Sequence, residues 1–133
     1  MQDHKLITAN VGNSRAIAVN KFRQVRRLTE DHVPQVPAER KRIERFGGRV
    51  AEVTNGPAAG KGGAKNPSHY RVFSKDKDIA GMPISRSLGD TAFHKVGVSC
   101  EPEIKHFVLE EDEQILILAS DGIWELMTLQ NVA

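Results

Sequence analysis

Several short runs of the chain contain apolar, β-favouring residues and are bounded by glycine, proline or polar clusters, which is typical of β-strands. We expect strands at residues 6–11, 15–19, 22–28, 49–54, 70–73 and 104–109. The first two runs are separated by Gly12-Asn13-Ser14, and these residue types tolerate the positive φ angles of tight turns. The pattern therefore predicts a β-hairpin at the start of a meander.

Three further segments differ from these short runs. Residues 37–46 are predicted to form a helix, because Pro37 suits its first turn and Gly47-Gly48 would end it. Residues 114–119 are almost wholly apolar, as expected of a strand buried on both faces. Residues 55–67 are rich in glycine and indicate a surface loop insertion. A mostly β chain with one or two helices belongs to the α+β class.

Length and composition fit one globular domain. The 133 residues are 39% apolar and 27% charged, close to the average of soluble proteins. The longest apolar stretch, residues 115–119, is far shorter than the roughly 18 residues of a membrane helix, so no membrane partner is predicted. Residues 1–10 lack the pattern of a signal peptide. Cys100, the single cysteine, fits a reducing compartment, and we expect an intracellular protein, cytoplasmic or nuclear.

Charge is distributed unevenly although the net charge is only +2. Residues 21–49 hold nine Lys and Arg against four Asp and Glu, whereas residues 101–113 hold six acids and one lysine. A basic run of this kind is more often a solvated face than a binding site, and here no aromatic residues are interleaved with it. We therefore predict no nucleic-acid partner.

The most suggestive polar residue for chemistry is Asp121, which follows the apolar run directly and precedes Gly122. A carboxylate held at the edge of a core suits Mg²⁺ or Mn²⁺, which prefer oxygen ligands. Taken alone, an Asp-Gly pair after a strand is more often a plain turn. Ser85, Ser87 and Ser120 do not lie in a Gly-x-Ser-x-Gly elbow, so covalent serine catalysis is not predicted.

Five segments in a fixed order change this picture. They are Ala9 to Arg15 (ANVGNSR), Leu28 to His32 (LTEDH), Glu39 through Arg42-Ile43 to Gly47-Gly48, Ser85 to Asp90 (SRSLGD), and Ala119 to Trp124 (ASDGIW). Together they closely resemble the metal-dependent protein serine/threonine phosphatases of type 2C. The resemblance spans nearly the whole chain apart from residues 55–67.

This resemblance implies a fold and a reaction. The fold is a β-sandwich of two antiparallel sheets flanked by helices, of which residues 1–133 would form the C-terminal part. A cluster of Mn²⁺ or Mg²⁺ ions acidifies a water molecule, which attacks the phosphorus of a phosphoserine or phosphothreonine in a phosphoprotein substrate. By its place in the Ser-Asp-Gly motif, Asp121 is implied to be a metal ligand.

The chain also departs from the family pattern. Asn13 and Glu125 stand where the family usually has aspartates that hold a third, weaker metal ion, so we expect that third-metal site to be weakened or absent. The family's upstream Asp-Gly-His motif, its phosphate-gripping arginine and its final Asp-Asn motif are not found in these 133 residues. We therefore expect this fragment alone to be inactive, with no catalytic residue assigned to it beyond the metal ligand.

Two alternatives stay open at this point. The chain is either the C-terminal part of a working phosphatase domain or a catalytically degenerate module that binds partners or phosphoproteins. Part of a sandwich also leaves sheet edges and an apolar face uncovered. Dimerisation or strand exchange between copies would cover them, so self-association of the fragment is a further expectation.

Overall fold

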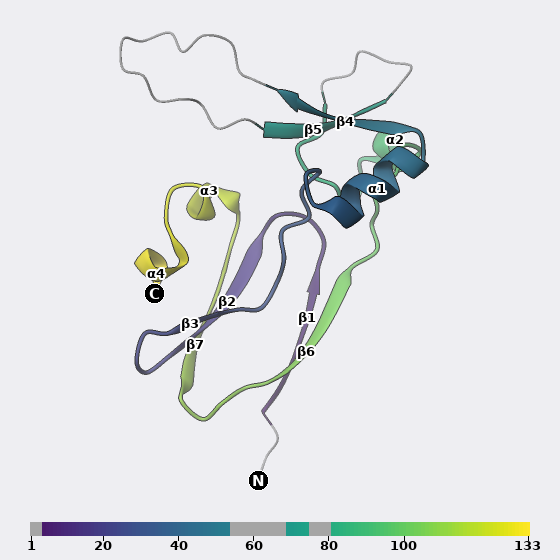
Figure 1. The fold of residues 1–133 in the computed structure, drawn as a ribbon. Helices are drawn as coiled ribbons and strands as arrows, with labels where there is room; N and C mark the ends of the chain where they lie inside the picture. Colours follow the sequence, from purple (N-terminus) through teal and green to yellow (C-terminus); the bar gives the residue numbers. More distant parts are fainter. Residues whose placement is uncertain (1–3, 54–68, 75–80) are drawn as a thin grey trace, which may run out of the picture. The chain divides into compact units, whose positions relative to one another are not determined.

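The structure, a computed structural model, describes residues 4–53, 69–74 and 81–133 (Figure 1). The chain divides into two compact units. The first unit comprises Met1–Asp31 with Glu101–Ala133, and the second comprises His32–Cys100. The predicted insertion at residues 55–67 lies outside the described residues.

The first unit contains two antiparallel sheets. In one, β1 (Lys5–Asn10) pairs with β6 (Glu103–Val108), so that Lys5 lies opposite Val108. In the other, β2 (Arg15–Asn20) is the central strand between β3 (Val25–Arg27) and β7 (Glu113–Ala119). All strand pairs in this unit are antiparallel.

Small side chains allow the two sheets to approach each other. Ala16 and Ala18 on one face of β2 form a buried cluster with Leu28. Leu6 from β1 and Phe107 from β6 pack against this cluster from the other sheet. Because successive side chains of a strand point to opposite faces, this face of β2 is the inner face of a sandwich.

The opposite face of β2 is covered by helices. Ile17 and Val19 are buried together with Trp124 at the end of α3 (Asp121–Trp124). Residues of α4 (Leu129–Val132) pack against the same cluster. Two antiparallel sheets with helices on an outer face confirm the predicted α+β class and its sandwich arrangement.

The predicted hairpin of the first two strands is wrong. Both strands form within a residue of their expected bounds, but β1 pairs with β6 while β2 pairs with β3 and β7. The turn between them carries the chain from one sheet to the other, with Gly12 at a φ of 112°. A glycine turn permits a hairpin, but the burial of each strand's apolar face decides which strand becomes its partner.

Two other expectations about strands also need correction. β7 forms as predicted, but Ile115, Leu116 and Leu118 are 53%, 44% and 76% exposed, so the strand is not buried on both faces. The reason is its position, because β7 lies at the edge of the three-stranded sheet with β2 on one side. The third strand is shorter than residues 22–28, because a turn with Arg23 at a φ of 61° precedes Val25.

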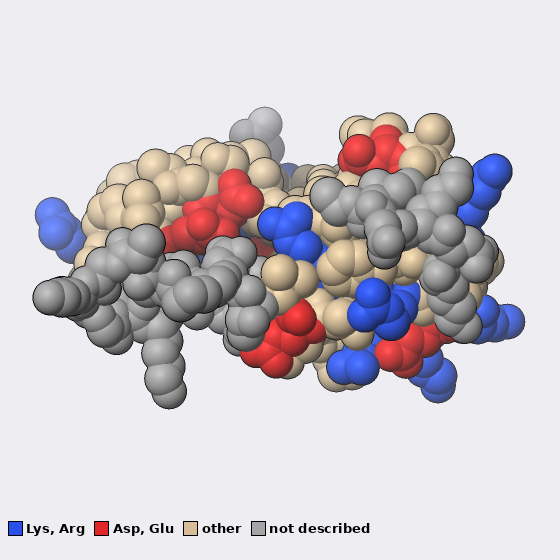
Figure 2. Space-filling view, turned by 90° about the horizontal axis from the view of Figure 1, so that it is seen from above, with Lys and Arg blue, Asp and Glu red and all other residues tan. Residues whose placement is uncertain are grey.

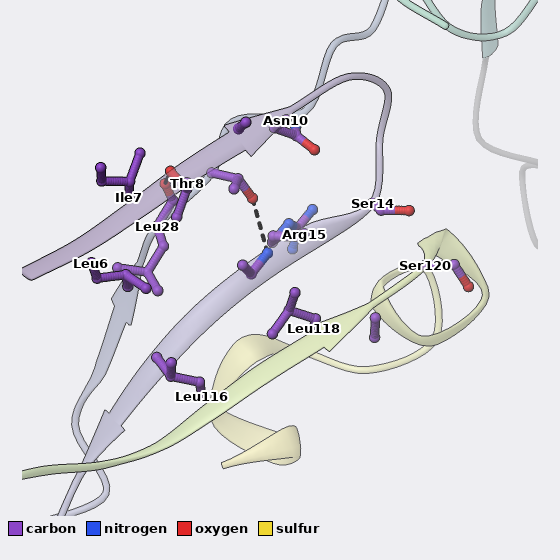
Figure 3. A pocket seen from close by; sticks show the side chains of 14 residues that line it. Leu6, Ile7, Thr8, Asn10, Ser14, Arg15, Leu28, Leu116, Leu118 and Ser120 are labelled. Atoms are coloured by element: carbon purple, nitrogen blue, oxygen red, sulfur yellow. Dashed lines mark hydrogen bonds between the residues drawn. The ribbon is translucent and has the colours of Figure 1, made fainter. Parts of the chain in front are cut away.

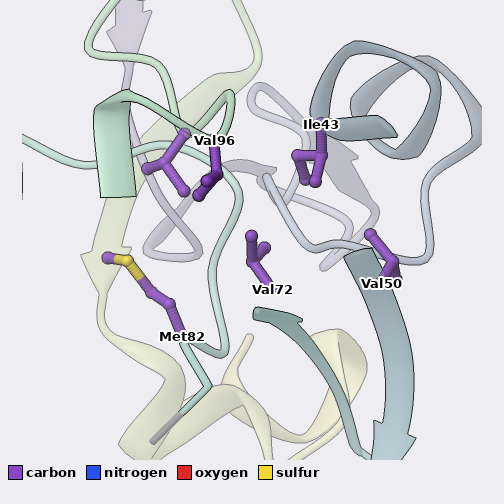
Figure 4. Packing of buried hydrophobic residues seen from close by; sticks show 6 residues of the cluster. Ile43, Val50, Val72, Met82 and Val96 are labelled. Atoms are coloured by element: carbon purple, nitrogen blue, oxygen red, sulfur yellow. The ribbon is translucent and has the colours of Figure 1, made fainter. Parts of the chain in front are cut away.

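The second unit packs one helix on a two-stranded sheet. α1 (Pro37–Arg45) matches the predicted helix, and β4 (Gly48–Val53) and β5 (His69–Ser74) match the predicted strands within a residue. The buried side chains of this unit include Ile43 of α1 and Val72 of β5 (Figure 4). A short helix, α2 (Thr91–His94), precedes the buried residues Val96 and Val98, which complete the core cluster.

Surface charge is mixed on the face shown in Figure 2, where basic and acidic side chains are interspersed among other residues. Within the described residues, no helix is long and apolar enough to cross a membrane.

Candidate functional site

Asp121 lies where the edge strand of the first unit ends and a helix begins. Ser120 has an extended backbone with ψ of 171°, and Asp121 is the first residue of α3. The peptide N–H of Glu125 donates to the Asp121 carbonyl at 2.8 Å. These backbone contacts hold Asp121 at the sheet end while its side chain stays exposed to solvent.

The turn between β1 and β2 brings Asn13 to this carboxylate. Asn13 Nδ2 donates to Asp121 Oδ2 at 2.9 Å, although the two residues are 108 positions apart. The turn is braced by the buried side chain of Asn10, whose Nδ2 donates to the Glu30 carbonyl at 2.8 Å and to the Gly12 carbonyl at 3.3 Å. The structure thus brings together two of the three residues that the resemblance singles out.

Glu125, the third of these residues, follows the last residue of α3. It lies one helical turn after Asp121, and its side chain is exposed. Its backbone N–H contacts Asp121 through the carbonyl of that residue.

Arg15 holds together the segments around Asp121 and Asn13, a role that the sequence did not indicate. Its Nε and Nη2 atoms donate to the two carboxylate oxygens of Asp31 at 3.1 and 2.6 Å. Its guanidinium lies 5.4 Å from the centre of the Trp124 ring, and Trp124 Nε1 donates to the Ala119 carbonyl at 2.7 Å. The two hydrogen bonds between Arg15 and Asp31 restrict the geometry of this pair. Together with the contact between Arg15 and Trp124, they hold three motif segments in one arrangement.

These residues do not by themselves form a metal site. Among the described residues, no three or more His, Cys, Asp or Glu side chains gather closely enough to hold a metal ion. Asp121 offers one carboxylate, and Asn13 directs an N–H donor rather than an oxygen toward it. A hard divalent cation takes several oxygen ligands, more than this single carboxylate–amide contact offers.

The two remaining motif segments meet in the second unit around Glu39. This residue of α1 is 4% exposed and accepts hydrogen bonds from Arg42 at 2.8 and 2.7 Å. Arg86 Nη2 donates to it at 2.7 Å, and so does the Ser85 hydroxyl at 2.7 Å. One buried carboxylate therefore joins α1 to the Ser85–Asp90 motif, 46 and 47 positions further along the chain.

Burial alone would raise the pKa of Glu39, but the hydrogen bonds from Arg42, Arg86 and Ser85 outweigh it and lower the pKa to about 2. The group is consequently ionised at neutral pH. Arg42 continues the network by donating to the carbonyls of Gly97 at 2.9 Å and Ser85 at 2.7 Å. Glu39 and Arg42 lie three apart on α1, a spacing at which helical side chains meet.

The antiparallel sheets, the helices and the gathering of motif segments in each unit define an α+β protein. A family model described as "Protein phosphatase 2C" matches residues 1–133. The chain therefore belongs to the protein phosphatase 2C family, as the resemblance of its motifs implied.

Curated relatives agree with this membership. The chain is 33% identical over 135 residues to "Probable protein phosphatase 2C 12" of Oryza sativa subsp. japonica, covering 98% of this chain and 32% of the relative. It is 30% identical over 134 residues to "Probable protein phosphatase 2C 61" of Arabidopsis thaliana, covering 98% of this chain and 38% of the relative. The chain thus spans about a third of the length of these relatives.

Solved structures share the fold. A serine-threonine phosphatase 2C from Toxoplasma gondii superposes with a TM-score of 0.79 at 24% identity, covering 96% of this chain and 41% of that one. A Caenorhabditis elegans sex determining protein superposes with a TM-score of 0.75 at 24% identity, covering 98% and 27%. At these identities the likeness supports the fold alone.

Proposed function

We propose that the complete domain to which this chain corresponds hydrolyses phosphoserine and phosphothreonine in phosphoproteins through a metal-activated water. We further propose that residues 1–133 alone do not turn over substrate. The observation that carries the proposal is the Asp121 carboxylate, exposed at the junction of β7 and α3 with the amide of Asn13 against it.

Phosphatases of this family use metal ions. We propose Mn²⁺ or Mg²⁺, because the candidate ligand Asp121 is a carboxylate and these ions prefer oxygen. When bound, such ions acidify a water molecule and neutralise charge on the phosphoryl group. To the ligands of such an ion this chain would contribute the carboxylate of Asp121. The orientation of this side chain is set by Asn13 and by the start of α3.

We also propose an intracellular location and a phosphoprotein as the partner that meets this site. The exposed thiol of Cys100 supports a reducing compartment. The interspersed charges of Figure 2 offer no support for a nucleic-acid partner.

The isolated chain provides the first test. With a phosphothreonine peptide and added Mn²⁺ or Mg²⁺, we expect no metal-dependent release of phosphate, because one carboxylate cannot assemble a site of two ions. Binding of the same peptide without turnover would instead favour the module that binds phosphoproteins. Sustained metal-dependent hydrolysis by residues 1–133 would refute the proposed inactivity of the fragment.

A graft tests the activity of the complete domain. Residues 1–133 replace the matching segment of the rice relative, which aligns with 98% of this chain. We expect the graft to release phosphate from the peptide in the presence of Mn²⁺. A folded graft with the activity of a buffer blank would contradict the proposed function.

A further inference from the structure

Asp121 begins a very short helix whose other end is packed in the core of the first unit. α3 has four residues, so Asp121 at its first position and Trp124 at its last lie within about one helical turn. Trp124 is 8% exposed and packs with Ile17 and Val19 of β2. Its Nε1 atom donates to the Ala119 carbonyl at 2.7 Å. The position of Asp121 therefore depends on how the Trp124 ring is held.

Arg15 contacts the Trp124 ring from the start of β2. In the antiparallel pairing of β2 and β7 it lies opposite Ala119, the last residue of β7. Figure 3 shows Arg15 and Ser120 at this same end of the two strands. The guanidinium lies 5.4 Å from the centre of the Trp124 ring, within the range of a cation–π interaction. A displaced guanidinium would therefore change the packing of the last residue of α3.

Asp31 holds that guanidinium in place. Its two carboxylate oxygens accept hydrogen bonds from Arg15 at 3.1 and 2.6 Å, and Oδ1 accepts another from Arg27 Nη2 at 2.7 Å. The side chains of Arg15 and Asp31 are only 17% and 23% exposed, so solvent screens their attraction weakly. Removal of the carboxylate would leave a partly buried charge on Arg15 without this partner.

The pair of Arg15 and Asp31 also lies next to the turn that carries Asn13. Arg15 follows Asn13 by two residues, and Asn13 Nδ2 donates to Asp121 Oδ2 at 2.9 Å. Asp31 is therefore linked to both partners of this contact. One link runs through Arg15 to the turn, and the other runs from Arg15 through Trp124 to α3.

We propose that Asp31 is a positioning residue for the metal ligand Asp121, and that it acts by holding Arg15 against the Trp124 ring. The inference rests on the proposed function, because it takes Asp121 to be a metal ligand. The oxygens of Asp31 accept hydrogen bonds from two arginines, so its carboxylate raises the affinity for Mn²⁺ without binding the ion. Loss of a group that orients a metal ligand typically weakens metal binding by about 10- to 100-fold.

Tryptophan fluorescence of residues 1–133 without metal tests whether Asp31 controls the packing of α3. Trp124 is the only tryptophan of the chain, so the emission reports this one ring. We expect Asp31→Asn to shift the emission to longer wavelength and to increase quenching by acrylamide. Glu30→Gln is the matched control, because it removes the same charge one position earlier from a carboxylate that is 57% exposed. Unchanged emission of Asp31→Asn, or an equal shift in the control, would overturn the proposal.

Calorimetry with Mn²⁺ tests the effect on the metal ligand, in the graft of residues 1–133 into the rice relative. We expect Asp31→Asn to lower the Mn²⁺ affinity by about tenfold or more and Glu30→Gln to leave it unchanged. Circular dichroism checks that both grafts keep the fold. A folded Asp31→Asn graft that binds Mn²⁺ as tightly as the parent would overturn the proposal.

A double-mutant cycle tests whether Asp31 acts through Arg15. Arg15→Gln alone should lower the Mn²⁺ affinity of the graft about as much as Asp31→Asn does, and the double variant should lose little more. Losses that add in the double variant would overturn the proposed route. The KM for the phosphothreonine peptide at saturating Mn²⁺ should stay at the parent value, whereas a general loss of structure would raise it. A graft that shows these Mn²⁺ affinities but releases no phosphate would contradict the proposed function and support the role of Asp31.

Discussion

The side chain of Asn13 stands against Asp121 at 2.9 Å, where phosphatases of the family usually have a second aspartate. The amide donates a hydrogen bond to the carboxylate. Two carboxylates at this distance would repel each other and would raise the pKa of one of them. The substitution therefore exchanges a potential cation ligand for a neutral partner of Asp121.

Asn13→Asp should reverse this exchange. We expect the affinity of residues 1–133 for Mn²⁺, measured by isothermal titration calorimetry, to rise by about tenfold, because a second carboxylate joins Asp121 as an oxygen ligand. Without metal, the same variant should unfold at a lower temperature because the carboxylates repel. Asn131→Asp is the control for added charge, since Asn131 is exposed on α4. Equal Mn²⁺ affinity in the two variants would exclude this account of Asn13.

The attachment of α1 to the Ser85–Asp90 motif in the second unit depends on the carboxylate of Glu39. Glu39 lies in the first turn of α1, and its ion pairs with Arg42 and Arg86 hold that helix to the Ser85–Asp90 motif. Both guanidinium groups are less than a quarter exposed, so removal of the carboxylate leaves them poorly solvated. The cluster therefore stabilises the arrangement of α1 and the motif more than a surface ion pair would.

Glu39→Gln is expected to lower the free energy of unfolding by about 3 kcal/mol at neutral pH, as urea denaturation measures it. Glu44→Gln is a matched control on the same helix, because the Glu44–Arg40 pair at 2.8 Å is exposed. Its loss should cost much less than the loss of the Glu39 carboxylate, because solvent screens an exposed pair. Similar losses in the two variants would show that the buried cluster adds no special stability.

The lowered pKa of Glu39 makes its contribution to the free energy of unfolding depend on pH. Its pKa is lowered to about 2 in the folded chain, so its stabilising effect is complete above about pH 4.5 and is lost as the pH falls toward about 2. The difference in unfolding free energy between wild type and Glu39→Gln should therefore shrink across that interval. A difference that stays constant from neutral pH to about pH 3 would contradict the assigned cause of the pKa shift.

At the scale of the whole molecule, local patterns predicted elements better than they predicted partners. The strands around Ile7, Ile17 and Val50 follow from runs of β-favouring residues, and α1 follows from Pro37 and the glycines at its end. These runs could not show that β1 pairs with β6 rather than with β2, because register depends on which apolar faces meet across distant segments.

The candidate site was predictable to a similar degree. The motif order identified Asp121 and Asn13, and the structure places them in contact. Composition and spacing gave no sign that Arg15 pairs with Asp31 or that Glu39 is buried. A charged side chain is buried only where the fold brings it partners from elsewhere in the chain. The exposed face of β7 was likewise missed, since an apolar run does not reveal how many neighbours a strand will have.

We propose that this chain brings one essential metal-binding carboxylate, Asp121, to a phosphatase domain. The most direct measurement is kcat/KM for Mn²⁺-dependent hydrolysis of the phosphothreonine peptide by the graft described above, with and without Asp121→Asn. We predict a loss of about a hundredfold or more for Asp121→Asn and little change for Glu111→Gln, which alters an exposed acid at the far end of β7. A folded Asp121→Asn graft that keeps the activity of the parent graft would contradict the claim.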